Sequence, residues 1–436
     1  MKATAPIQIQ LTMDKPVYGG DCLSRLANPD GKPGKAVFVP LTLPGETVSA
    51  RITEDKRSFL KAELDRVITP SPSRVAALCV HFGKCGGCHY QHADYASQLA
   101  IKEQILRETL SRSGVTVPAE IAVLSGNPWE YRNRIRLAIT PAGELAYRSR
   151  RSHDLIPIRE CPIAAPILLR AARNVQAFLA KNASQTPVSE LELFTNRDES
   201  QLQITLFCQT KPDRDSQSWL ADLHVELPKK TCLRLALDDS GVAPRILAQA
   251  GDSSLIYQAA GFDYVVDQGA FFQVNRWLID DFVQLVTAGQ SGDLAWDLYA
   301  GVGLFARPLT ANFRQVQAVE SAPASSAALR QNLSETTGTA IAATTLDFLR
   351  RNRQEREPRP DFIVLDPPRA GLGDEVTSLL NAIGAPLIHY VSCDPTTLAR
   401  DLRALTLERY RIDQITLVDM FPQTYHLETV VQLSRS

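Results

Sequence analysis

A strand, a glycine turn, a helix and a second strand follow one another in the last third of the chain. Residues 294–299 form an apolar run typical of a buried strand, and Gly301 and Gly303 follow before a helix begins. The second run, residues 316–319, ends in Glu320. This order predicts a doubly wound, parallel α/β sheet. In such folds glycines let a ligand approach the backbone, and an acid at the next strand end binds ribose hydroxyls.

A third apolar run, residues 362–365, is followed directly by Asp366-Pro367-Pro368-Arg369. The two prolines restrict the backbone, so an acid is held rigidly at the carboxyl edge of the sheet, where ligands of such folds bind. The glycine turn alone also fits a nicotinamide oxidoreductase. The D-P-P-R segment favours a methyltransferase that acts on planar bases, for which it is typical.

Cys393 lies where the apolar run 387–391 ends and a helix is predicted to begin. Asp394 suits the N-cap and Pro395 the first turn of that helix. A helix N-terminus favours the thiolate, which is the form that attacks carbon electrophiles. Cys393 is therefore a candidate nucleophile, with a buried structural cysteine as the alternative.

Three other cysteines have the C-x5-C-x2-C spacing of a metal-binding loop: Cys79, Cys85 and Cys88. The candidate for a fourth ligand is Cys161, which precedes a proline as in some iron–sulfur proteins. The spacing does not choose between an iron–sulfur cluster and zinc. The remaining cysteines are expected to be inert core residues: Cys22, Cys208 and Cys232.

Short β-like runs separated by turns fill the chain up to about residue 74 and predict a small β-barrel. Such barrels often bind oligonucleotides. Ordinary solvated charges are the alternative for the basic residues that could meet phosphates here: Lys32, Lys35, Arg51, Lys56, Arg57 and Lys61.

A local basic patch lies between residues 132 and 159, although the net charge of the whole chain is only −1. This segment contains seven arginines and only two acids. Tyr131 and Tyr147 could stack on bases. We interpret the patch as a contact with RNA, with a solvated β-hairpin face as the alternative.

The 436 residues suffice for two or three domains, and no apolar run is long enough to cross a bilayer. The N-terminus also has no apolar signal segment. We therefore expect a soluble, cytoplasmic protein with no membrane contact and no obligate protein partner.

Taken together, the motifs closely resemble the RNA uracil-5 methyltransferase family, and within it the 23S ribosomal RNA branch that carries a TRAM domain and a [4Fe-4S] cluster. The resemblance covers nearly the whole chain. Its motifs are Val37-Phe38-Val39-Pro40, residues 81–88, Phe271-Phe272-Gln273-Val274-Asn275, Asp297-Leu298-Tyr299, Asp366-Pro367-Pro368-Arg369, Ser392-Cys393 and His426-Leu427-Glu428-Thr429.

The resemblance implies an α/β protein in three parts. Residues 1–70 would form an OB-like TRAM barrel that binds RNA. Residues 71–262 would form a central α+β domain with the iron–sulfur cluster and the basic patch. Residues 263–436 would form a doubly wound, class I methyltransferase domain that uses S-adenosylmethionine.

The resemblance also implies roles for individual residues. Cys393 would be the nucleophile and Glu428 the proton acceptor. The cluster would be held by Cys79, Cys85, Cys88 and Cys161, and S-adenosylmethionine by Gln273, Tyr299, Gly301, Glu320, Asp347 and Asp366. The chain departs from the family pattern at Ala300, Leu304, Asp347 and Asp394, of which the last places a negative charge beside the thiolate.

The expected reaction is methylation of C5 of one uridine in 23S rRNA through a covalent Cys–C6 adduct. Its product would be 5-methyluridine. The target base would be flipped from its stack, and the barrel and the basic patch would hold the surrounding RNA. The alternatives are a tRNA methyltransferase acting on the T-loop uridine, a nicotinamide oxidoreductase and a non-enzymatic RNA-binding metalloprotein.

Overall fold

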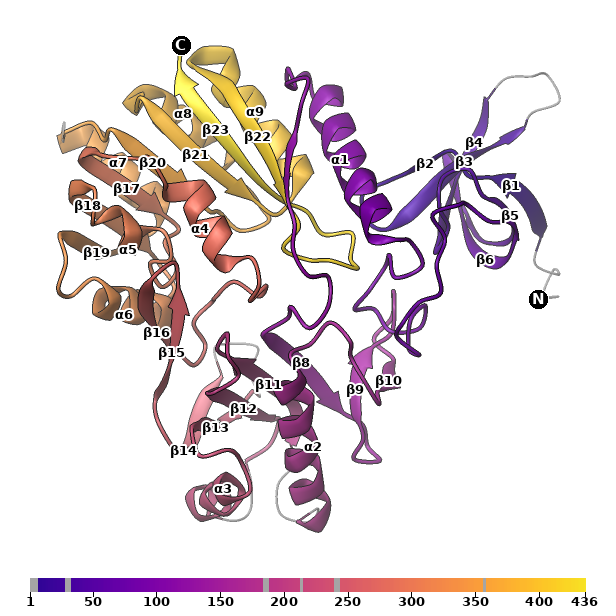
Figure 1. Cartoon of the computed structure of the whole chain (residues 1–436), viewed down its shortest axis with the longest axis horizontal. Helices are drawn as coiled ribbons and strands as arrows, with labels where there is room; N and C mark the ends of the chain where they lie inside the picture. The colour runs from indigo at the N-terminus through magenta and orange to yellow at the C-terminus, as the bar shows by residue number, and fades with distance from the viewer. Residues whose placement is uncertain (1–6, 28–32, 183–187, 212–214, 239–243, 356–357) are drawn as a thin grey trace.

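The strands of the chain are distributed over four sheets that follow one another roughly in sequence (Figure 1). The computed structural model describes residues 7–27, 33–182, 188–211, 215–238, 244–355 and 358–436. Within these ranges the sheets contain six, seven, two and eight strands. No helix in the described ranges is both long enough and apolar enough to cross a bilayer.

The first sheet folds around a core of its own. Alternating residues of its strands point inward, as in Val37 and Val39 or Val48 and Ala50, which are all fully buried. The strand order is β1-β5-β6-β4-β3-β2. Its strands are β1 (Gln8–Thr12), β2 (Lys15–Pro16), β3 (Asp21–Ala27), β4 (Pro33–Pro40), β5 (Thr47–Asp55) and β6 (Phe59–Thr69).

Most of the barrel's basic residues form ion pairs with neighbouring acids. Lys35 contacts Asp55, Arg51 contacts Glu63, and Lys56 and Lys61 share Glu54. Arg57 is exposed, and Lys32 lies outside the described residues. These pairs lie on the surface of the sheet, where their side chains are accessible to solvent.

The seven-stranded sheet is covered by two helices, α2 (Pro166–Lys181) and α3 (Ser216–Val225), which pack on it in one core. The strand order is β10-β9-β8-β11-β12-β13-β14. These strands are β8 (Arg134–Ile139), β9 (Leu145–Arg148), β10 (Leu155–Pro157), β11 (Val188–Thr195), β12 (Leu202–Cys208), β13 (Thr231–Leu237) and β14 (Arg245–Ala250). The ribbon of β15 (Ser254–Ala259) and β16 (Phe262–Asp267) leads to the last part of the chain.

The eight-stranded sheet has the doubly wound arrangement that the glycine turn predicts. Its strand order is β19-β18-β17-β20-β21-β23-β22-β7, and the neighbours from β19 to β21 are all parallel. The strands are β17 (Gly292–Leu298), β18 (Phe313–Glu320), β19 (Gly338–Ala342), β20 (Phe362–Leu365), β21 (Leu387–Ser392), β22 (Tyr410–Val418), β23 (Glu428–Arg435) and β7 (Ala122–Leu124).

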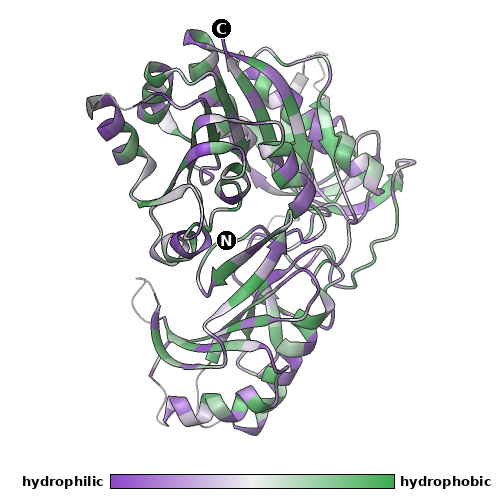
Figure 2. Ribbon diagram, turned by 60° about the vertical axis from the view of Figure 1, so that its left-hand side comes forward, coloured by the Kyte–Doolittle hydropathy of each residue, from purple (hydrophilic) through white to green (hydrophobic). Residues whose placement is uncertain are grey.

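Helices cover both faces of this sheet, which explains why its inner strands are rich in apolar residues (Figure 2). One face carries α4 (Ile279–Thr287), α5 (Ala306–Leu309) and α6 (Pro323–Asn332). The other carries α1 (Tyr95–Arg112), α7 (Thr345–Glu355), α8 (Gly373–Ile383) and α9 (Pro395–Glu408).

Two early elements complete this late sheet. β7 pairs in parallel with β22 at the sheet edge, and the buried face of α1 belongs to the same core as α8 and α9. The segment that precedes the seven-stranded sheet therefore packs with the C-terminal sheet.

Candidate active site

A cavity of about 610 Å³ opens at the carboxyl edge of the eight-stranded sheet, where ligands of doubly wound folds bind. We call it the edge cavity. It brings together seven of the residues that the sequence nominates: Gln273, Tyr299, Gly301, Glu320, Asp366, Cys393 and Glu428. Asp347 does not line it: this side chain lies in the first turn of α7, is exposed, and accepts a hydrogen bond from Thr344.

The turn after β17 is left-handed, because Tyr299, Gly301 and Gly303 all have positive φ angles of 67°, 57° and 92°. A Cβ atom at Gly303 would lie only 2.8 Å from Leu329, so this position requires glycine. Both carboxylate oxygens of Glu320 accept backbone hydrogen bonds, from Gly301 at 2.9 Å and Ala322 at 2.6 Å. Glu320 is thus fixed beside the turn, where an acid can meet the hydroxyls of a ribose.

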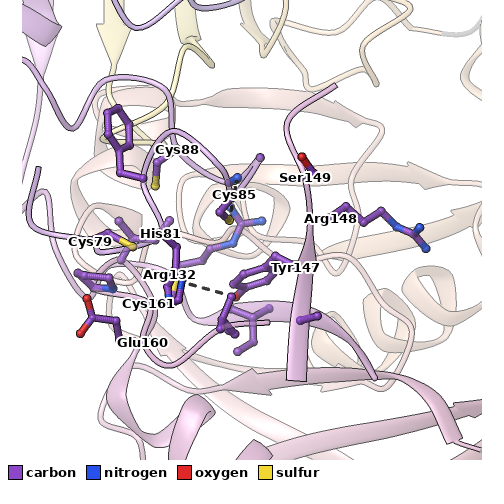
Figure 3. A pocket seen from close by; sticks show the side chains of 18 of the residues that line it. Cys79, His81, Cys85, Cys88, Arg132, Tyr147, Arg148, Ser149, Glu160 and Cys161 are labelled. Carbon is purple, nitrogen blue, oxygen red and sulfur yellow. Dashed lines mark hydrogen bonds between the residues drawn. The ribbon is translucent and has the colours of Figure 1, made fainter. Parts of the chain in front are cut away.

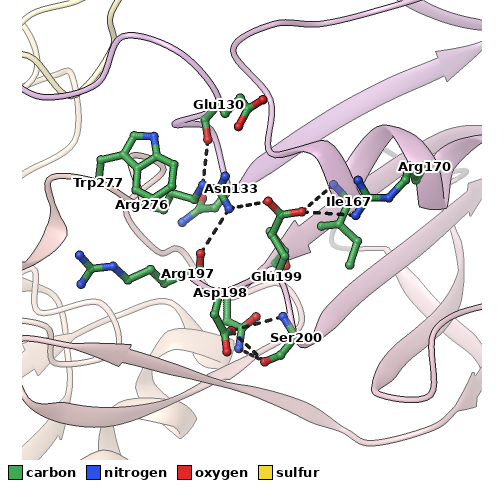
Figure 4. Close-up of polar contacts among 12 residues, drawn as sticks. Glu130, Asn133, Ile167, Arg170, Arg197, Asp198, Glu199, Ser200, Arg276 and Trp277 are labelled. Atoms are coloured by element: carbon green, nitrogen blue, oxygen red, sulfur yellow. Dashed lines mark hydrogen bonds and ion pairs between the residues drawn. The ribbon is translucent and has the colours of Figure 1, made fainter.

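Gln273 enters the cavity from the segment before α4, and it donates a hydrogen bond to Asp366 at 3.4 Å. The buried Asn133 donates to the Gln273 carbonyl at 3.0 Å. Farther along this segment, Arg276 pairs with Glu199 at 2.7 Å, as Figure 4 shows. Residues beside the strands of the seven-stranded sheet, directly before β8 and between β11 and β12, therefore help to hold the wall of the edge cavity.

Two carboxyl groups lie in the cavity wall, of which Glu428 is buried and Asp366 is half-buried. Burial raises the pKa of Asp366 to about 7. Burial, and then the charge of Asp366, raise the pKa of Glu428 well above its usual value. Because two neighbouring buried carboxylates repel each other, the pair tends to retain a proton near neutral pH.

Cys393 lies at the end of β21, directly before α9, as the sequence predicts. Asp394 caps the helix by accepting hydrogen bonds from the amides of Thr396 and Thr397. In the protein without ligands, other groups outweigh the effect of the helix terminus on Cys393. Burial, followed by the charges of Glu428 and Asp366, raises the pKa of Cys393 to about 12, against the opposing effect of Arg369.

The loop between β22 and β23, residues 419–427, forms another wall of the cavity and leads into Glu428. Helix α1 holds it through two buried polar residues one turn apart. Lys102 donates to Asp419 at 2.5 Å and to the Phe421 carbonyl at 3.0 Å, and Gln98 exchanges hydrogen bonds with Gln423. Sequence reasoning missed these residues, although two polar positions in an otherwise apolar helix face were a usable signal.

The four cysteines of the metal-loop prediction line a second cavity, of about 630 Å³ (Figure 3). We call it the cysteine cavity. Burial raises the pKa of Cys85 to about 11 and of Cys88 to about 12. In the part of the chain that is described, no three metal-binding side chains lie close enough together to hold one metal ion.

The arginine-rich segment forms the hairpin strands β8 and β9, and much of its charge is neutralised. Arg136 and Arg148 both pair with Glu190, and Arg151 pairs with Asp21 of the barrel. The expectation that Tyr131 stacks on bases is wrong, because this side chain is fully buried and donates to the Pro422 carbonyl. Tyr147 is also largely enclosed, and its hydroxyl faces Cys161.

The remaining cysteines, Cys22, Cys208 and Cys232, are buried in the cores of the first two sheets, as expected.

Two known protein families match parts of this sequence. Residues 94–436 match the family described as tRNA (uracil-5-)-methyltransferase, and residues 11–64 match the TRAM domain. A 23S rRNA (uracil(1939)-C(5))-methyltransferase RlmD of Shewanella piezotolerans is 32% identical over 419 residues, covering 91% of this chain and 90% of the relative. An uncharacterized RNA methyltransferase of Aquifex aeolicus is 31% identical over 98% of both chains.

Among solved structures, the Pyrococcus abyssi tRNA (uracil-54, C5)-methyltransferase in complex with S-adenosyl-L-homocysteine has a TM-score of 0.77 to this chain. It is 24% identical and covers 98% of this chain and 100% of its own. That likeness confirms the fold, and the match over residues 94–436 identifies the enzyme class. The chain belongs to the tRNA (uracil-5-)-methyltransferase family of RNA-modifying enzymes and carries an N-terminal TRAM domain.

Proposed function

We propose that the protein transfers the methyl group of S-adenosylmethionine to C5 of one uridine in 23S rRNA, forming 5-methyluridine. The observation that carries this proposal is that Cys393, Glu428 and Asp366 line one cavity together with the candidate cofactor residues. The charges of Glu428 and Asp366 also act on Cys393. The substrate is inferred from the relatives of known name, which modify 23S rRNA.

In the mechanism we propose, the ionised forms of Asp366 and Glu428 are favoured by the positive charge of the bound methyl donor. Asp366 then accepts the thiol proton and the Cys393 sulfur bonds to C6 of the uracil, while Glu428 stays ionised. The C5–C6 electron pair moves through C4 onto O4, which forms an enolate. C5 then takes the methyl group, whose bonding electrons stay on the sulfur of the donor. Glu428 removes the C5 proton, and the C6–S bond breaks to restore the C5–C6 double bond.

The proposed cofactor site consists of Gln273, Tyr299, Gly301, Glu320 and Asp366, with Asp347 outside the edge cavity. Glu320 supports this assignment because its carboxylate is held at a strand end beside the glycine turn. The positions that depart from the family pattern, Ala300 and Leu304, also line the cavity.

Substitution of Cys393 by alanine tests the nucleophile. Cys393→Ala should abolish methyl transfer, while binding of S-adenosylhomocysteine and RNA stays nearly unchanged, because other residues carry that binding. Turnover at even a few per cent of the wild type, measured with methyl-tritiated cofactor, would refute the role of Cys393.

We further propose that Cys79, Cys85, Cys88 and Cys161 hold a [4Fe-4S] cluster. The four thiols surround a cavity and are not gathered around a single point, which suits a polynuclear centre, and iron would supply the positive charge that buried thiolates need. Protein purified without oxygen should contain iron and acid-labile sulfide. Colourless protein with stoichiometric zinc would contradict the assignment.

The choice of RNA is tested by comparing two substrates. Unmodified transcripts of 23S rRNA and of tRNA are incubated with the protein and labelled cofactor, and the methylated position is mapped. We expect one methylated uridine in 23S rRNA. Methylation confined to the T-loop of tRNA would support the alternative that the family description and the Pyrococcus abyssi structure suggest.

The division into domains at residues 1–70, 71–262 and 263–436 is likewise proposed. The separate cores of the first and second sheets support it. The packing of α1 and β7 on the C-terminal sheet ties the second part to the third.

A further inference from the structure

His426 lines the edge cavity together with Cys393 and Glu428, two residues before the latter. Aromatic neighbours fix the plane of its ring. Tyr425 lies 4.3 Å away between ring centroids, Phe421 5.7 Å and His89 6.5 Å. The ring is therefore held at the cavity wall in one orientation.

The hydrogen bonding of the ring determines which nitrogen carries the proton. The guanidinium of Arg369 lies 3.3 Å from Nδ1 of His426. An arginine can only donate, so Nδ1 must be the acceptor, and the neutral ring carries its hydrogen on Nε2. Burial and the charge of Arg369 lower the pKa of His426 to about 3, which keeps the ring neutral.

This arrangement leaves a fixed N–H donor on the cavity wall. Among the described residues, Arg369 is the one hydrogen-bond partner recorded for the His426 ring, so Nε2 is available to a ligand. A donor fixed in this way is effective where negative charge develops during a reaction.

We infer that His426 is a further catalytic residue whose Nε2–H donates a hydrogen bond to O4 of the target uracil and stabilises the enolate. The inference rests on the proposed function. When the Cys393 sulfur bonds to C6, the electron pair of the C5–C6 bond shifts and O4 becomes negatively charged. The same N–H group stabilises O4 until the electrons return to the C5–C6 bond and the C6–S bond breaks. Arg369 is then a positioning residue, because it fixes the tautomer of His426.

The test uses RNA that carries 5-fluorouridine at the target position. Because fluorine at C5 cannot leave as a proton does, the methylated Cys393 adduct is trapped, and its rate of formation can be followed on denaturing gels. His426→Leu removes the donor, whereas His426→Gln retains an N–H group of similar reach. Binding of S-adenosylhomocysteine reports whether each variant is folded.

We expect His426→Leu to slow adduct formation roughly 100-fold, the usual effect of removing one such donor, with little change in the RNA concentration that gives half the maximal rate. His426→Gln should recover a substantial part of the rate. The inference is overturned if the leucine variant forms the adduct as fast as the wild type, or if a folded glutamine variant is as slow as the leucine variant. Failure of the wild type to form any adduct would instead refute the proposed function itself.

Discussion

In the ligand-free cavity, the charges of Glu428 and Asp366 raise the pKa of Cys393, and the charge of Asp366 raises the pKa of Glu428. The protonated thiol of Cys393 is therefore favoured in the protein without RNA and cofactor. A cationic sulfonium in the cavity would favour the ionised forms of these groups. Activation of the nucleophile would then depend on the bound methyl donor, which protects the thiol from side reactions in the resting protein.

Glu428→Gln tests the proton acceptor. The variant should add Cys393 to the uracil and transfer the methyl group once, but it should then stall, because glutamine cannot remove the C5 proton. A protein–RNA adduct that survives denaturation is expected with unmodified RNA, and turnover should fall by roughly 10² to 10⁴-fold. The double variant with Cys393→Ala serves as the control and should form no adduct. Weaker RNA binding without any adduct would place the base elsewhere.

The raised pKa of Asp366 predicts how stability depends on pH. Below about pH 4, the carboxyl is protonated in the folded and the unfolded chain, and its contribution is fully present. As the pH rises toward the folded pKa of about 7, only the unfolded chain loses this proton, so the stability decreases. Relative to Asp366→Asn, the wild type should lose up to about 1.4 kcal/mol of unfolding free energy per pH unit in this window. Denaturant titrations of both proteins measure this difference, and parallel curves would contradict it.

At the scale of single elements, α1 and the 419–427 loop act together. Asp419, which forms a buried ion pair with Lys102, also accepts a hydrogen bond from the hydroxyl of Tyr95 at 2.8 Å. Both side chains of the pair are fully buried. Loss of one partner would leave the other charge unpaired in the core, next to the loop that positions His426 and Glu428.

Lys102→Met should therefore destabilise the protein by about 3 to 5 kcal/mol and lower turnover. The double variant Lys102→Met/Asp419→Asn should recover much of the stability. Glu108→Gln, which breaks the solvent-accessible pair of Glu108 with Lys15, is the matched control on the same helix and should cost less than about 1 kcal/mol. Unfolding in denaturant distinguishes these outcomes, and equal effects of Lys102→Met and Glu108→Gln would contradict the assigned role of the buried pair.

A structural feature can be predicted from the sequence when the contacts that determine it join residues close together in the chain. The glycine turn at 301–303, the cap at Asp394 and the strand ending at Asp366 are local, and the structure confirms the fold expected from them. The partner of Lys102 could not be predicted, because Asp419 is 317 residues away. The acids that pair with the arginines of β8 could not be predicted, because they lie on β11 and the sequence of one strand does not show which strand lies beside it.

At the scale of the whole molecule, the barrel reaches the edge of the active site. Tyr18, in the turn between β2 and β3, contacts Tyr425 edge-on with 5.4 Å between ring centroids. Tyr425 adjoins His426. RNA bound by the barrel would therefore lie close to the loop that carries the candidate catalytic groups.

Removal of residues 1–70 is expected to weaken RNA binding and to leave the affinity for S-adenosylhomocysteine unchanged, because the edge cavity is lined by residues from 271 onward. Filter binding and calorimetry measure the two affinities. Arg57→Ser in the intact chain is the milder variant and should lower RNA affinity mainly at low salt. A parallel loss of cofactor affinity on truncation would show that the barrel supports the C-terminal fold instead.

The pairing of β7 with β22 also has a consequence for the synthesis of the protein. α1 and β7 leave the ribosome early, but the strand and loop that they contact are translated among the last residues of the described chain. Until then the apolar face of α1, with Ile101, Ile105 and Leu106, has no partner from the C-terminal sheet. We expect the nascent chain to expose this surface until β22 and the 419–427 loop have been translated, and to depend on chaperones that shield it. Activity would then be acquired in a single step, after these elements have formed.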